Sequence, residues 1–66
     1  MQFFEVLAED LQNGDFISFA GYPLEVEMTI TKDDNIEIYC IDRDNLDERI
    51  KISTKIYRKI ERLNAH

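Results

Sequence analysis

Carboxylates are the side chains of this sequence most able to do chemistry. Acid–base catalysis needs two of them held in a pocket that separates their pKa values. Neighbouring acids occur at 33–34 and throughout 42–48, but both stretches are predicted turns, where carboxylates are solvated. A hydrolytic triad also needs a histidine as its base, and the single histidine is His66 at the end of the chain. We therefore predict no catalytic residues, and a protein that is not an enzyme.

Metal ligands are equally sparse. Calcium needs oxygen ligands around a tight loop, and Asp42–Glu48 lacks both a glycine at the turn and a correctly spaced final glutamate. Arg43 within that loop also opposes a cation. Zinc needs about four ligands, and the chain has one cysteine, Cys40, besides His66. Cys40 falls on the inward face of a predicted strand, where it serves as a small core residue. We predict no metal and no cofactor.

The chain is short, which limits how it can be stabilised. Its 66 residues make one domain, spanning 1–66, and 44% of them are hydrophobic, as in a globular protein. In a domain of this size, the free energy gained by burying apolar surface only slightly exceeds the entropy cost of ordering the chain. Small domains therefore often add a disulfide, a metal or a partner subunit. One cysteine allows no internal disulfide. A very regular β core or a homo-oligomer therefore remains open.

Targeting signals are not evident. The start, Met1–Glu5, has no basic region followed by an apolar stretch, and the longest apolar run is residues 6–8. A single cysteine is typical of a reducing compartment. We expect a soluble, intracellular, cytoplasmic protein with no membrane partner.

The charge is divided unevenly along the chain. Residues 1–48 hold thirteen acidic and two basic side chains, whereas residues 49–66 hold six basic side chains and Glu61. One interpretation is that the basic end lies beside the acidic body and neutralises it. The other is that it forms a basic stripe for an anionic partner.

The hydrophobic pattern predicts short strands separated by polar turns. Residues 24–31 alternate most clearly, placing Leu24, Val26, Met28 and Ile30 on a buried face. Tyr39 and Ile41 indicate that the second face of their strand is also partly covered, as in a curled sheet. The predicted strands are 3–7, 16–20, 24–31, 36–41 and 49–53, with a connection at 21–23 and polar loops at 32–35 and 42–47.

The C-terminal stretch is open to two interpretations. Ile56, Tyr57, Ile60 and Leu63 have helical spacing. A barrel, however, needs a closing strand, which favours a 3₁₀ turn over 53–55 followed by a strand over 56–62. We predict an all-β, five- to six-stranded barrel, with a short 3₁₀ or α-helical C-terminal segment as the alternative to the last strand.

The stretch 14–26, GDFISFAGYPLEV, resembles the N-terminal SH3-like (KOW-like) domain of bacterial elongation factor P and its archaeal and eukaryotic counterparts. The resemblance implies an SH3-like barrel and a link to ribosomes or RNA. That family carries a functional lysine in a loop rich in Gly and Pro between the third and fourth strands. The equivalent loop, 31–35, has Lys32 but no Gly or Pro, and two acids follow the lysine. The modified-lysine role is therefore not transferred to Lys32.

A small SH3-like barrel can bind another protein without any special residues, through a groove or an open strand edge. We predict a non-enzymatic adaptor whose partner protein is unidentified, similar in size to bacterial or phage accessory proteins. Its predicted apolar contact patch is Tyr22, Pro23 and Tyr39.

Two alternative functions depend on the charged side chains rather than on an apolar patch. A weak RNA-binding module would use the basic C-terminal segment, where an aromatic lies among cations. An acidic mimic of nucleic acid would inhibit a host protein. The residues of the RNA alternative are Arg49, Lys51, Lys55, Tyr57, Arg58, Lys59 and Arg62.

Overall fold

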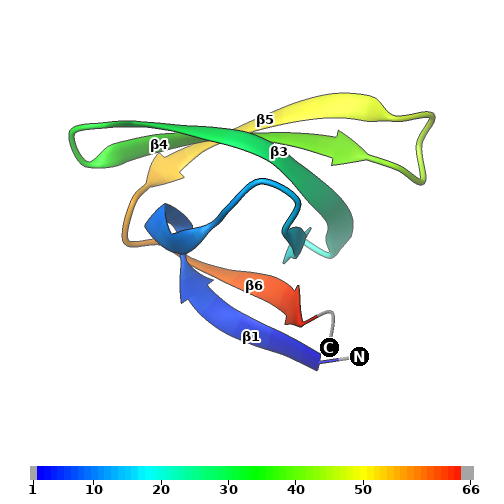
Figure 1. Cartoon of the computed structure of the whole chain (residues 1–66), viewed down its shortest axis with the longest axis horizontal. Helices are drawn as coiled ribbons and strands as arrows, with labels where there is room; N and C mark the ends of the chain where they lie inside the picture. The colour runs from blue at the N-terminus through cyan, green and yellow to red at the C-terminus, as the bar shows by residue number, and fades with distance from the viewer. Residues whose placement is uncertain (1, 65–66) are drawn as a thin grey trace.

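The computed structural model describes residues 2–64, which form six β-strands and one short 3₁₀ helix (Figure 1). The prediction of an all-β chain is confirmed. His66 lies outside the described residues. The strands are β1 (Gln2–Leu7), β2 (Phe16–Phe19), β3 (Tyr22–Lys32), β4 (Asn35–Asp42), β5 (Glu48–Lys55) and β6 (Lys59–Asn64), and the 3₁₀ helix η1 is Ala8–Asp10.

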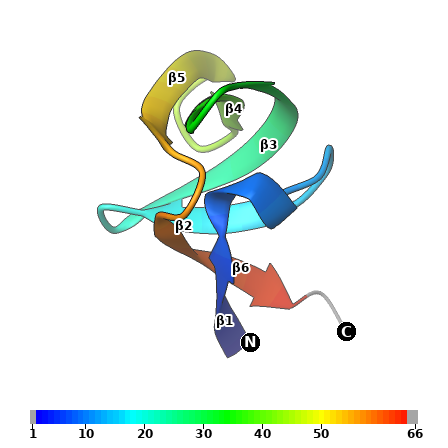
Figure 2. The same ribbon diagram turned by 90° about the vertical axis from the view of Figure 1, so that its left-hand side faces the viewer.

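All six strands belong to one antiparallel sheet in the order β1-β6-β2-β3-β4-β5, so β1 and β5 are its edges. The sheet folds over itself, with β3, β4 and β5 on one side and β1 and β6 on the other, as Figures 1 and 2 show. Strand β3 makes the bend because its first part pairs with β2 and its second part with β4. Glu25 pairs in both ladders, opposite Phe16 and Ile41.

The core fills the space between the two layers. Its largest fully buried side chains come from β2, β3 and β4, where Ile17, Val26 and Ile38 are at most 1% exposed. The turns seal its ends: Ala8 of η1 donates a backbone hydrogen bond to Arg58 at 2.8 Å, and Gly14 donates one to Val26 at 2.8 Å. The core residues are Ala8, Leu11, Ile17, Leu24, Val26, Ile36, Ile38, Cys40, Ile52 and Ile60.

A β-bulge in β3 overturns part of the predicted burial pattern. The ladder to β4 shifts between Val26 and Met28, so Glu27 is an extra residue. A one-residue shift turns every later side chain to the opposite face. Leu24 and Val26 therefore reach the core as predicted, whereas Met28 and Ile30, predicted to be buried, are 42% and 45% exposed.

Both hairpins of β3 are tighter than predicted. Ala20, predicted to end a strand, forms the two-residue turn before β3 together with Gly21, and both have positive φ (51° and 82°). This is the pattern of a type I′ turn, whose twist matches that of the strands. The next hairpin turns at 33–34 rather than over four residues, because Lys32 and Asn35 still pair in the ladder. Lys32 therefore lies in a strand.

The C-terminal segment forms a strand in the interior of the sheet, between β1 and β2. Residues 53–55, predicted to be a 3₁₀ turn, continue β5, and a turn over 56–58 precedes β6, which begins at Lys59 rather than at residue 56. Strand β6 pairs with β1 along its whole length and with β2 at Ile17 and Ser18. These two ladders provide hydrogen-bond partners for more of the β6 backbone than a short helix could. The segment is therefore a strand, although its apolar residues have helical spacing.

Candidate binding groove at the seam of the sheet

An apolar groove of about 480 Å³ lies between β5 and the β2–β3 hairpin, and we call it the seam groove. Strand β5 is a free edge, because within residues 2–64 it pairs only with β4. Four consecutive residues of β5, 50–53, line the groove, so the unpaired backbone edge of the strand faces it. The lining residues are Phe19, Ala20, Tyr22, Leu24, Ile50, Lys51, Ile52 and Ser53.

The tight β2–β3 turn positions the aromatic wall of this groove. Phe19 and Tyr22 are directly opposite each other in the last pair before the turn. The pair before them on the same face, Ile17 and Leu24, is buried in the core. Phe19 is half-buried and Tyr22 is 62% exposed. The groove is therefore an uncovered continuation of the core.

The structure separates the three residues of the predicted protein-binding patch. Tyr22 lines the seam groove, as described above. Its neighbour Pro23 faces the opposite side of β3, where it lines a small hollow with Ile41 and Arg43. Tyr39 lies in the middle of β4, opposite Met28. They therefore do not form one surface, and only Tyr22 belongs to the seam groove.

Three residues of the predicted basic stripe are paired with acids of the body. Arg49 lies 3.0 Å from Glu27, and Lys51 lies 3.3 Å from Glu37, both across the outer face of the sheet. The third pair, Arg62 with Asp15, is longer at 3.8 Å. Such exposed pairs add little stability, but they cancel local charge. This arrangement agrees with the neutralising interpretation of the charge asymmetry.

The remaining residues of the stripe gather around the β5–β6 turn. Arg58 packs over the ring of Phe19, and Tyr57 is 64% exposed. Among residues 2–64, no carboxylate forms an ion pair with Lys55, Arg58 or Lys59. The acidic turn of the neighbouring hairpin is close, because the Ile56 N–H donates to the Asp34 carbonyl oxygen at 2.9 Å.

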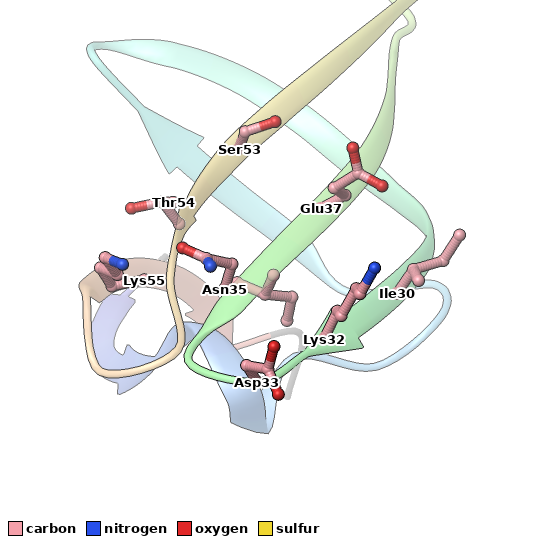
Figure 3. Close-up of a pocket in the computed structure, with 9 residues that line it drawn as sticks. Ile30, Lys32, Asp33, Asn35, Glu37, Ser53, Thr54 and Lys55 are labelled. Carbon is pink, nitrogen blue, oxygen red and sulfur yellow. The ribbon is translucent and has the colours of Figure 1, made fainter.

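A second, more polar groove of about 720 Å³ lies at the tip of the β3–β4 hairpin (Figure 3). This is the position of the functional lysine loop in the family named above. Lys32 and Lys55 flank Asn35 in the ladder, and the acids Asp33 and Glu37 line the same groove. Opposite charges alternate there, so the groove offers no surface of one sign.

The described residues form no cluster that could bind a metal, and their one cysteine is buried. Groups of three or more His, Cys, Asp or Glu side chains that could hold a metal do not occur in residues 2–64. Cys40 is a buried free thiol, and desolvation by burial raises its pKa to about 11. It is therefore protonated and a poor nucleophile at neutral pH. None of the described helical structure is long and apolar enough to span a membrane.

Comparisons with known proteins bear on the fold. No protein-family model matches the chain, and neither does any curated protein sequence. Among solved structures, a translation initiation factor eIF-5A family protein from Naegleria fowleri superimposes with a TM-score of 0.82 at 13% identity. The fold is SH3-like. The match covers 97% of this chain and 49% of that one, so the chain spans about half the length of its structural relative. The resemblance to the SH3-like domain of elongation factor P and its counterparts is thus confirmed for the fold.

Sequence reasoning missed most of the seam groove. Phe19 belongs to a predicted strand, and the alternation of residues 49–53 indicates that Ile50 and Ile52 point inward, which their partial and near-complete burial confirms. What the pattern could not reveal is that the sheet leaves a gap between them. One signal was present: aromatic residues at 19 and 22 flank a two-residue turn, where they fall on the same face.

Proposed function

We propose that this chain is a non-enzymatic protein-binding domain that holds an extended segment of its partner in the seam groove. The observation that carries the proposal is the free edge of β5 facing an apolar groove, with Tyr22 and Ile50 on its two walls. An extended segment that joins a sheet edge gains main-chain hydrogen bonds, and pockets for alternate side chains supply specificity. The groove provides both features.

The expected ligand follows from the lining. The groove has apolar side chains from both walls, and the only ionic lining residue, Lys51, is paired with Glu37 outside it. A segment with apolar residues at every second position would place them against Phe19, Tyr22 and Ile50. We therefore expect a linear, alternating apolar motif rather than a highly charged one. The single buried thiol is compatible with a site of action inside the cell.

RNA binding by the basic C-terminal segment is the alternative function, and the fold shared with a translation initiation factor family protein favours testing it. The charge layout opposes it, because Arg49, Lys51 and Arg62 are already paired with acids. A nucleic-acid mimic would need a face of acids alone. On the outer face of the β3–β4–β5 layer, Glu25, Glu27 and Glu37 each have a basic partner instead.

A display library of random linear peptides provides a defined probe for the groove. The domain should enrich peptides with alternating apolar residues, and a synthetic peptide from that pool should lose affinity about tenfold or more with Tyr22→Ser. Tyr57→Ser is the matched control, since the two tyrosines are 62% and 64% exposed but Tyr57 lies outside the groove.

Two results would overturn the proposal. One is a library that yields no specific peptide, and the other is an affinity that Tyr57→Ser lowers while Tyr22→Ser leaves it unchanged. An NMR titration with structured RNA separates the alternative. Shifts confined to residues 55–59 at about 50 mM salt that fade at about 200 mM would support RNA binding. The protein-binding proposal expects no such shifts.

A further inference from the structure

The edge strand β1 is unusually open to pairing. It is six residues long, and within the described chain it pairs only with β6, so its outer backbone edge is free. Glu5 is its single charged residue. Phe3 and Phe4 are 48% and 47% exposed. Natural sheets blunt such edges with charges, prolines or bulges, and an exposed apolar edge with few of them is a template on which another strand can pair.

The opposite edge of the same sheet has the protection that β1 lacks. Strand β5 carries two lysines, Lys51 and Lys55, as well as Glu48 and Arg49. Charged side chains on an edge, lysine above all, resist pairing between copies of the same protein. The contrast makes β1 the edge at which two copies can meet, and it leaves the seam groove beside β5 uncovered.

The distribution of charge favours the same location. The whole chain carries a net charge of −6, which resists self-association. Strands β1 and β6 together hold two acids, Glu5 and Glu61, and two bases, Lys59 and Arg62. This two-stranded region is therefore neutral, and two copies that meet there avoid most of the repulsion between their acidic parts.

We propose that two copies of this chain pair through β1, antiparallel about a two-fold axis at Phe4. In this register Phe4 lies opposite Phe4 of the second copy, which forms an aromatic cross-strand pair. Phe3 lies opposite Glu5 of the second copy, so the two Glu5 carboxylates do not face each other. The interface is the same patch on both copies, and it joins their sheets into one continuous sheet.

Sedimentation equilibrium of the purified chain between about 10 μM and 1 mM tests the proposal. The wild-type chain should form dimers, and Phe4→Lys should weaken the dimer about a hundredfold, because the symmetric interface loses the aromatic contact in both copies and gains two charges. Phe16→Lys is the control, since Phe16 is 45% exposed but lies in β2, away from the free edge. It should leave the dimer unchanged.

Amide hydrogen exchange of the wild-type chain gives a second test that needs no variant. Amides of β1 that point away from β6 should become protected as the concentration rises, while those at the free edge of β5 should not. A chain that stays monomeric at about 1 mM, a dimer that survives Phe4→Lys, or concentration-dependent protection located at β5 would each overturn the proposal.

Discussion

The guanidinium carbon of Arg58 lies 5.0 Å from the centre of the Phe19 ring, which joins the β5–β6 turn to the aromatic wall of the seam groove. Besides the hydrogen bond from Ala8 to Arg58, the backbone of the same turn is held at Ile56. Glu9 donates a hydrogen bond to the Ile56 carbonyl oxygen at 3.1 Å, and the Ile56 N–H bonds to the Asp34 carbonyl oxygen at 2.9 Å. The groove is therefore bounded at this end by parts that are fixed before any partner arrives, which limits the ordering cost of binding.

The turn at Ala20 offers a direct test of the hairpin that shapes this groove. Ala20 has φ of 51°, a left-handed conformation that costs an L-residue about 1 kcal/mol. Asn tolerates this conformation, and Asn-Gly is the preferred type I′ pair. Ala20→Asn should raise the free energy of unfolding by about 0.5–1 kcal/mol in a urea titration. Ala20→Val should lower it, since a β-branched residue resists positive φ. Equal effects from both changes would contradict the turn assignment.

Because of the bulge at Glu27, truncation of two isoleucines on paired strands should have very different effects on stability. Ile30 is 45% exposed and Ile38 is fully buried. Ile38→Ala should cost about 3–4 kcal/mol of stability, since it leaves a cavity in the core. Ile30→Ala should cost less than about 1 kcal/mol. Urea midpoints of both variants decide the question, and a large loss from Ile30→Ala would mean that β3 continues without a bulge.

The same bulge shows where a pattern of residue types stops being informative. Alternation correctly places Leu24 and Val26 inside, and on the next strand it correctly places Cys40 inside, together with Ile36 and Ile38, which share its face. Alternation is a local property, however, and a bulge inverts it without any change in residue type. The bulge lies just after Glu25, where β3 leaves its pairing with β2 and continues with β4 alone.

The candidate site was hidden for a related reason. Its walls come from β2, β3 and β5, and within the described residues β5 pairs only with β4, so it does not join the β2–β3 hairpin. The two walls are about thirty residues apart in the chain, so no local window of sequence reports the groove. Tyr22 could be selected from its type alone. Its neighbours Phe19 and Ile50 could be placed on an inner face, but not at an opening.

Two glutamates placed directly opposite each other should make the β1–β6 ladder sensitive to salt. Glu5 and Glu61 form a like-charge cross-strand pair. Glu61→Lys should raise the free energy of unfolding by about 0.5 kcal/mol, because it converts repulsion into attraction. Thermal unfolding at low salt and at about 1 M NaCl measures the effect, which should shrink as charges are screened. Glu61→Gln should give a smaller gain, and a gain that persists at high salt would have another cause.

Burial of Cys40 should make the stability of the domain depend on alkaline pH. Burial raises the pKa of its thiol to about 11, whereas the pKa of an unfolded cysteine is about 8.5. Between these values the folded chain keeps a proton that the unfolded chain releases, so stability should fall as pH rises through this range. Cys40→Ala should remove this part of the decline in urea midpoints measured between about pH 8 and 10.5. An identical decline in that variant would assign the effect to other groups.

Backbone amide exchange and inter-strand NOEs in the complex with a selected peptide test the central claim most directly, that a partner segment joins the free edge of β5. If the segment joins this edge, amides in residues 50–53 should gain protection, and NOEs should connect the peptide to that strand and to Tyr22. A peptide that binds while these amides stay unprotected, and that instead contacts the polar groove around Lys32 and Lys55, would contradict it.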